Sequence, residues 1–141
     1  MAKILHQFVI EAPAEKVFEA FCTPQGLDSW WTLQSAGKPE MGNVYTFFFG
    51  PAYDWRASVV RVKPNSSLTW QMTQAMDDWM PTRVGFRLTE KDGQTTVQFF
   101  HEGWKKANDH FCISNYCWGQ LLAGLKNYVE TGAIVPFEKR N

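Results

Sequence analysis

The chain has 141 residues, enough for one domain with a single core, and we expect residues 1–141 to form one domain. Fourteen Lys and Arg residues balance fourteen Asp and Glu residues. Zero net charge argues against a nucleic-acid binder, whose affinity comes largely from phosphate contacts. No apolar run approaches the roughly 20 residues that cross a bilayer, and the amino-terminal residues lack an export cleavage site. These features predict a cytoplasmic protein that neither binds nucleic acid nor inserts into a membrane.

Aromatic residues are unusually frequent, since Phe, Trp and Tyr make up 16% of the chain. Such side chains bury large areas but pack awkwardly, and they often line cavities. The three cysteines cannot all pair with one another, and in a reducing compartment we expect free thiols.

The amino-terminal part predicts a strand followed by two helices. Residues 4–11 form a strand-length segment, and Pro13 then opens a helix at a position where its missing N–H costs nothing. Pro24 ends this helix, and residues 25–31 indicate a second short helical turn. From Gly42 the periodicity changes to that of strands. Five strand-length segments follow, separated by turn sequences: residues 43–50, 54–64, 67–72, 82–90 and 95–102.

The last element is a long helix over Asp109–Thr131, about 34 Å at ~1.5 Å per residue. Strands joined by short turns are expected to be antiparallel neighbours, and only this helix is long enough to cover one face of their sheet. The order predicts an α+β fold, with about six antiparallel strands, two short helices after the first strand and a long C-terminal helix.

A rotation of about 100° per residue along this helix predicts a stripe of side chains that face the sheet. The stripe consists of Phe111, Trp118, Leu122, Leu125 and Val129.

Polar residues and cysteines of the same helix carry separate expectations. Ser114 and Asn115 fall on the inward side, and a buried amide without partners costs ~1–3 kcal/mol, so Asn115 should bond the sheet, water or a ligand. Cys112 and Cys117 lie ~140° apart, so they cannot share a metal or form a disulfide within one helix. We expect no metal site and no cofactor.

Several segments together resemble a known family. They are IEAPAEKVFEAFCTPQGLDSWW from Ile10, VVRVKPNSSLTW from Val59, TTVQFFHEGW from Thr95 and, from Trp118, a Trp-x-x-Leu-Leu pattern ending in YVETG. They are similar to the activator-of-heat-shock-chaperone-ATPase homologues (AHSA-like) of the START-like, or SRPBCC, superfamily. The resemblance runs from about Ile10 to Pro136. It implies a helix-grip fold, in which a curved sheet wraps around the C-terminal helix and leaves a cavity. Relatives carry lipids or hormones, cyclise polyketides or bind chaperones.

Period-2 alternation predicts which side chains of the sheet face the helix. If Phe99 points inward, so does His101, which begins the HEGW that matches the family's His-x-Gly-Trp motif. His101 could act as a general base or polar anchor, or it could bond the turn before the last helix. Arg56 and Arg61 cannot both face inward, because their separation is odd. Phe48 and Phe100 should point outward if Phe47, Phe49 and Phe99 point inward.

We expect a non-catalytic protein that binds a small apolar or aromatic molecule between the sheet and the C-terminal helix. The residues expected to contact it are Trp30, Trp31, Phe47, Phe49, Trp55, Trp70, Met72, Trp79, Phe86, Phe99, His101, Phe111, Asn115, Trp118 and Leu122. One alternative is an enzyme of cyclase or hydrolase type that uses His101. Another is a co-chaperone-like interaction module, as a monomer or homodimer, that contacts a chaperone through the outer sheet face or the loop at residues 76–80.

Overall fold

The computed structural model describes residues 2–140. Within them the elements follow one another as β1 (Ala2–Ile10), α1 (Ala14–Cys22), α2 (Pro24–Trp30), β2 (Gln34–Ala36), β3 (Val44–Phe48), β4 (Asp54–Lys63), β5 (Ser67–Gln74), the 3-10 turn η1 (Asp77–Trp79), β6 (Arg83–Lys91), β7 (Gln94–Trp104), α3 (Asp109–Thr131) and the 3-10 turn η2 (Phe137–Lys139).

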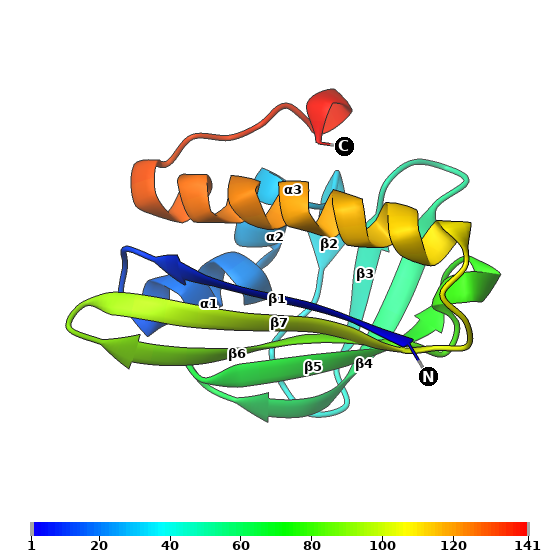
Figure 1. The fold of residues 1–141 in the computed structure, drawn as a ribbon, viewed down its shortest axis with the longest axis horizontal. Coiled ribbons are helices and arrows are strands. Elements are labelled where there is room, and N and C mark those ends of the chain that lie inside the picture. Colours follow the sequence, from blue (N-terminus) through cyan, green and yellow to red (C-terminus); the bar gives the residue numbers. More distant parts are fainter. Residues whose placement is uncertain (1, 141) are drawn as a thin grey trace.

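The strands form one antiparallel sheet in the order β1-β7-β6-β5-β4-β3-β2. The sheet curves, and α3 lies along its concave side (Figure 1). This arrangement confirms the predicted helix-grip fold. The sheet has one strand more than the six expected. This strand is β2, whose three residues pair with β3 and are too few to give a period-2 signal.

Local sequence explains the junction between α1 and α2. Thr23 ends α1, and its hydroxyl then accepts a 3.0 Å hydrogen bond from the Gly26 N–H at the start of α2. Pro24 occupies the first turn of α2, where its fixed φ suits the helix. Gly26 lets the two helices pack closely, because a Cβ there would lie 2.6 Å from the main chain of Ala20.

The long helix α3 has the predicted bounds. Asn108 caps its first turn by accepting a 3.0 Å bond from the N–H of Phe111, and Gly132, at φ 81°, ends it in the left-handed conformation. Ser114 is buried as predicted, but the prediction for Asn115 is wrong, because this residue is exposed. Asn115 lies about 60° from the centre of the stripe, and the sheet covers a narrower sector than that.

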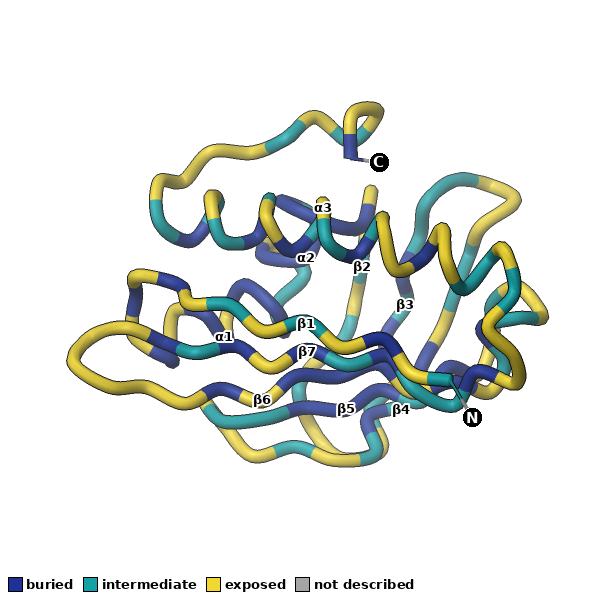
Figure 2. Tube along the Cα trace, in the orientation of Figure 1, coloured by how far each residue is buried: buried dark blue, intermediate teal, exposed yellow. Residues whose placement is uncertain are grey.

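Figure 2 shows buried positions alternating with exposed ones along β1 and β7, and buried residues of α3 facing the sheet. The middle of this interior is packed solid. Phe21 stacks on Phe86 with 3.9 Å between ring centroids, and Phe99 lies 4.6 Å from Trp118. Trp70 adds a contact to Phe86 at 6.1 Å. The broad cavity expected between sheet and helix is therefore filled by aromatic side chains at its centre.

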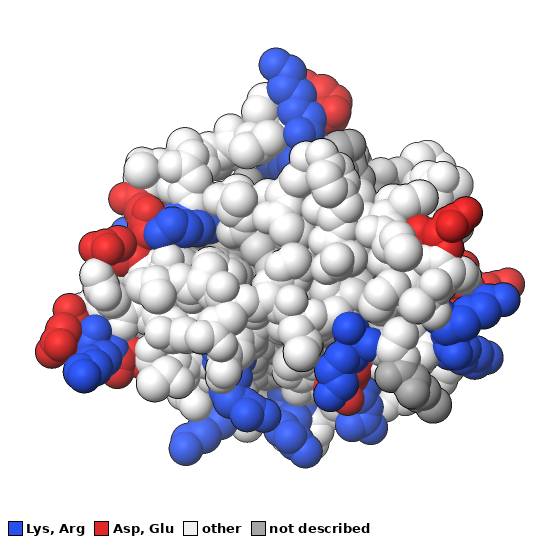
Figure 3. Space-filling model, viewed as in Figure 1, with Lys and Arg blue, Asp and Glu red and all other residues white. Residues whose placement is uncertain are grey.

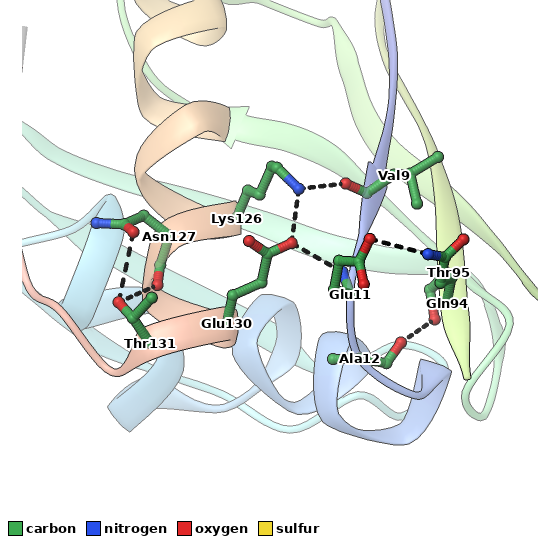
Figure 4. A network of polar contacts seen from close by, with 9 residues as sticks. All are labelled: Val9, Glu11, Ala12, Gln94, Thr95, Lys126, Asn127, Glu130 and Thr131. Atoms are coloured by element: carbon green, nitrogen blue, oxygen red, sulfur yellow. Dashed lines mark hydrogen bonds and ion pairs between the residues drawn. The ribbon is translucent and has the colours of Figure 1, made fainter.

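A polar network ties the carboxyl end of α3 to the end of β1 (Figure 4). The Lys126 ammonium donates to the Val9 carbonyl at 2.7 Å and to Glu130 at 2.6 Å. Glu130 in turn accepts a 2.8 Å bond from the N–H of Glu11. These groups are partly exposed and add little free energy, but they link the end of α3 to the end of β1.

Two further positions in the sheet bear on the predicted alternation. Arg56 and Arg61 are both exposed. The β4–β5 register shifts between Val59 and Arg61, so the simple inward–outward alternation does not continue from one arginine to the other. Phe100 points outward as expected and is half-buried, since its ring covers Gly85, where a Cβ would lie 2.5 Å from the Phe100 Cζ.

Candidate functional site

A pocket of about 400 Å³ opens at one end of the helix–sheet interface. It lies between the amino-terminal half of α3, the β3–β4 hairpin, η1 and the segment after α3. Its lining residues are Trp31, Phe49, Tyr53, Trp55, Met76, Trp79, His110, Ile113, Ser114, Cys117, Trp118, Leu121, Phe137, Glu138 and Arg140.

Five aromatic side chains of the lining touch one another in a closed cycle, which we call the aromatic wall. Successive ring centroids lie 5.7 Å (Trp31–Phe49), 5.3 Å (Phe49–Trp55), 4.6 Å (Trp55–Trp79), 6.0 Å (Trp79–Trp118) and 5.0 Å (Trp118–Trp31) apart. These are contact distances for aromatic pairs. The wall therefore supports itself and presents a continuous aromatic surface.

The members of the wall come from four parts of the chain, since Phe49 and Trp55 share the β3–β4 hairpin. Trp31 directly follows α2, Trp55 is the second residue of β4, Trp79 ends η1 and Trp118 lies in the middle of α3. Phe49 follows β3, where its N–H bonds the carbonyl of Tyr53 at 2.9 Å and closes the hairpin loop. Only the tertiary fold brings these residues together.

The loop that carries Trp79 is anchored to α3. Asp78 accepts a 3.1 Å hydrogen bond from Nδ1 of His110 and a 3.3 Å bond from the side chain of Asn108. The bond from His110 is the main reason why the pKa of Asp78 lies below its ordinary value. The indole N–H of Trp79 donates to the Ser114 hydroxyl at 3.3 Å. Residues 77–79 are thus held against the start of α3.

Among residues 2–140, Arg140 is the buried arginine, with 8% of its surface exposed. Its guanidinium donates to the carbonyls of Asp28 and Thr32 at 2.9 Å each and to that of Val135 at 2.8 Å. Two of these carbonyls lie at the carboxyl end of α2, where the helix leaves unpaired acceptors. No sequence pattern marked Arg140, because it lies outside any periodic segment.

His101 is fully buried beneath the aromatic wall and does not line the pocket. Its Nδ1 accepts a 3.1 Å bond from the indole N–H of Trp118, and its Nε2 lies 2.8 Å from the hydroxyl of Thr82. Burial, aided by the charge of His110, lowers the pKa of His101 to about 3, so the imidazole is neutral at pH 7. Both ring nitrogens are engaged, and the histidine holds α3 to the turn before β6.

The structure distributes the fifteen expected contact residues over four environments. Trp31, Phe49, Trp55, Trp79 and Trp118 line the pocket. Those buried in the core outside it are Trp30, Phe47, Trp70, Met72, Phe86, Phe99, His101 and Leu122. Phe111 is half-buried against Trp104, with 5.3 Å between the rings, and Asn115 is exposed. Sequence reasoning had no signal for three pocket residues, because Tyr53 lies in a loop and Phe137 and Glu138 lie in the short turn η2.

Within residues 2–140 no group of three or more His, Cys, Asp or Glu side chains is placed to hold a metal ion. Over the same residues, no helix combines the length and the apolar character needed to span a membrane. The cysteines of the described chain are free thiols: Cys22 is buried, Cys112 exposed and Cys117 in between.

An antiparallel sheet that grips a long C-terminal helix, with a pocket where the two meet, defines a helix-grip domain of the START-like class. The chain belongs to the family described as Activator of Hsp90 ATPase homolog 1-like protein, whose model matches residues 11–130. The family resemblance of the sequence motifs is thereby confirmed.

Solved structures support the same assignment of fold. The Aha1 dimer from Colwellia psychrerythraea is 32% identical, with a TM-score of 0.84 over 94% of this chain and 98% of that one. Protein BH1534 from Bacillus halodurans is 25% identical, with a TM-score of 0.73 over 92% and 98%. Protein SSP2350 from Staphylococcus saprophyticus is 20% identical, with a TM-score of 0.79 over 95% and 96%. No curated protein sequence is detectably similar to this chain.

Proposed function

We propose that this protein binds one small aromatic or largely apolar molecule, without transforming it, in the pocket bounded by the aromatic wall. The observation that carries the proposal is the closed cycle of five contacting aromatic side chains, which forms one wall of a pocket of about 400 Å³. Ligand pockets of proteins commonly measure ~300–1,000 Å³ and are lined mainly by apolar and aromatic groups. The centre of the interface is filled, and this pocket lies at one end of it.

The rim of the pocket supports this interpretation. Tyr53 is 48% exposed, Met76 47% and Ile113 60%, although all three side chains are large and apolar. Exposed apolar groups that surround one opening are typical of a site that is covered when it is occupied. Methionine can adjust its conformation to ligands of different shape.

The environment of His101 argues for binding without catalysis. A general base needs a free ring nitrogen within hydrogen-bond reach of the substrate. Nδ1 and Nε2 of His101 already contact Trp118 and Thr82. We therefore assign no reaction to this histidine. We also infer that the protein acts in the reducing cytoplasm, where its free thiols persist.

The test is a thermal-shift screen against planar aromatic compounds, followed by titration of the best binder. A ligand at 100 times its Kd stabilises the folded state by ~2.7 kcal/mol, which moves the Tm by several degrees. Trp55→Leu should weaken binding at least tenfold. Phe48→Leu is the matched control, because Phe48 belongs to the same hairpin but does not line the pocket. A flat screen, or equal affinity in the two variants, would refute the proposal.

A second candidate is a protein-interaction module, favoured by the family and by one surface feature. The chain from Phe111 to Leu125 contains no charged residue, and Ile113 and Tyr116 of this segment are 60% and 68% exposed. Figure 3 shows charged side chains gathered around the margin of this face, whose middle is uncharged. Calorimetry with an Hsp90-type chaperone, and light scattering for the homodimer, test this candidate. Tyr116→Lys should abolish any such association while leaving ligand affinity unchanged.

A further inference from the structure

Arg140 contributes a positive charge to the pocket, and this charge has no carboxylate partner among the described residues. Among the lining residues it is the single Lys or Arg. No Asp or Glu oxygen of residues 2–140 lies within 4.0 Å of its guanidinium. The side chain of Asp28, which is close in space, instead accepts a 2.6 Å bond from the hydroxyl of Thr32.

The contacts of the guanidinium leave part of it available. An arginine carries five N–H donors, and three of them are used on the carbonyls of Asp28, Thr32 and Val135. A buried charge is costly unless an opposite charge and hydrogen bonds compensate it. The carbonyls supply hydrogen bonds and hold the planar group rigidly, while the carboxylates of Asp28 and Glu138 attract it only from beyond ion-pair distance.

Resting on the proposed function, we propose that the pocket is selective for a planar aromatic monoanion, such as an aromatic carboxylic acid, and that Arg140 binds its carboxylate. The ring of the ligand would lie against the aromatic wall, whose Trp31 directly precedes the Thr32 that Arg140 contacts. The guanidinium suits this role because its planar donors match the two oxygens of a carboxylate. Because the group is already immobilised, little side-chain entropy is lost on binding.

The other charged groups near the pocket determine how many negative charges a ligand can carry and still bind well. Glu138 is exposed and lines the same pocket, and Asp78 lies nearby but is paired with His110. A second negative charge on the ligand would meet these carboxylates without a free cation to balance it. The site therefore favours one negative charge over two.

The test compares two compounds of equal size, naphthalene-2-carboxylate and naphthalene-2-carboxamide. Titration of the intrinsic tryptophan fluorescence of the full chain at pH 7 and low salt gives both Kd values. The carboxylate should bind about tenfold more tightly, as expected for hydrogen bonds to a charged group. Arg140→Gln should remove this preference, and Arg140→Lys should keep part of it. Arg61→Gln, at an exposed site, is the control for net charge and should keep it entirely.

Each outcome decides between the two proposals. Equal affinities in the wild-type protein would overturn the role of Arg140 while leaving the binding function intact. A preference that survives in Arg140→Gln would also overturn it, because another group would then bind the anion. If Arg140→Gln loses affinity for the amide as well, the wild-type protein decides the matter. Its preference for the carboxylate over the amide should weaken as the salt concentration rises, and a preference that salt does not change would overturn the role of Arg140. Absence of binding by either compound would count against the proposed function itself.

Discussion

The indole N–H of Trp118 donates a 3.1 Å hydrogen bond to Nδ1 of the buried His101. Because Nδ1 is the acceptor, the proton of the neutral ring resides on Nε2, which donates to the Thr82 hydroxyl at 2.8 Å. That hydroxyl donates onward to the carbonyl of Trp79 at 2.6 Å. The chain of bonds thus joins two members of the aromatic wall, and His101 fixes the shape of the pocket from beneath.

Trp118→Phe should destabilise the protein by about 1–3 kcal/mol, because it leaves Nδ1 of His101 buried without a donor. Urea unfolding measures the loss. The matched control is Trp104→Phe, since Trp104 is equally buried but its indole N–H has no partner. The control removes a similar ring without breaking a hydrogen bond, so it should cost less. Equal losses in the two variants would contradict this account.

The free energy of unfolding should decrease as the pH is lowered into the acid range, because of His101. Burial lowers the pKa of His101 to about 3 in the folded state, against the ordinary 6.5 in the unfolded chain. Between these values the unfolded chain binds one more proton, so the free energy of unfolding decreases by ~1.4 kcal/mol per pH unit as the pH is lowered. Above pH 6.5 the contribution is complete.

Urea unfolding at pH 4, 5, 6 and 7 checks this dependence. His101→Gln keeps a donor and an acceptor but cannot titrate, so its slope should be smaller by ~1.4 kcal/mol per pH unit. Parallel slopes for the variant and the wild-type protein would show that His101 is not the group responsible.

Two glycines should respond in opposite ways to replacement by alanine. Gly124→Ala should stabilise α3 by up to about 1 kcal/mol, because the new methyl group would lie 3.9 Å from Val135, at ordinary contact distance. Gly26→Ala should destabilise the fold markedly, since the same group would lie 2.6 Å from the main chain of Ala20. Thermal unfolding of both variants measures the difference, and a stabilised Gly26→Ala would contradict the close packing of α1 on α2.

The three cysteines should differ in their rates of alkylation. Cys112 is exposed, Cys117 lies partly covered in the pocket lining, and Cys22 is buried, which raises the pKa of its thiol. Iodoacetamide should modify them in that order, as followed by peptide mass spectrometry. A ligand in the pocket should slow the reaction of Cys117 alone. Equal protection of Cys112, one and a half turns away on the same helix, would indicate a different site.

Several features could be predicted because they depend on residues close in sequence. The bounds of α3 follow from a cap at Asn108, a periodic apolar stripe and Gly132. Pro24 marks the junction of α1 and α2 for the same kind of local reason. The family motifs then supplied the arrangement of the sheet around the helix. Periodicity also identified the aromatic side chains that would be buried, although it could not separate core from pocket.

The sequence by itself determined the α+β class, the order of the elements and a surplus of aromatic side chains on inward faces, because these depend on local propensity and period. Only the tertiary structure decided that the centre of the interface is filled by Phe21, Phe86 and Phe99 while space remains at its end. It also decided that Arg140, and neither Arg56 nor Arg61, is the buried cation. Packing density and the partners of a buried charge depend on contacts between residues more than 100 positions apart, such as Arg140 and Asp28, and no local pattern encodes them.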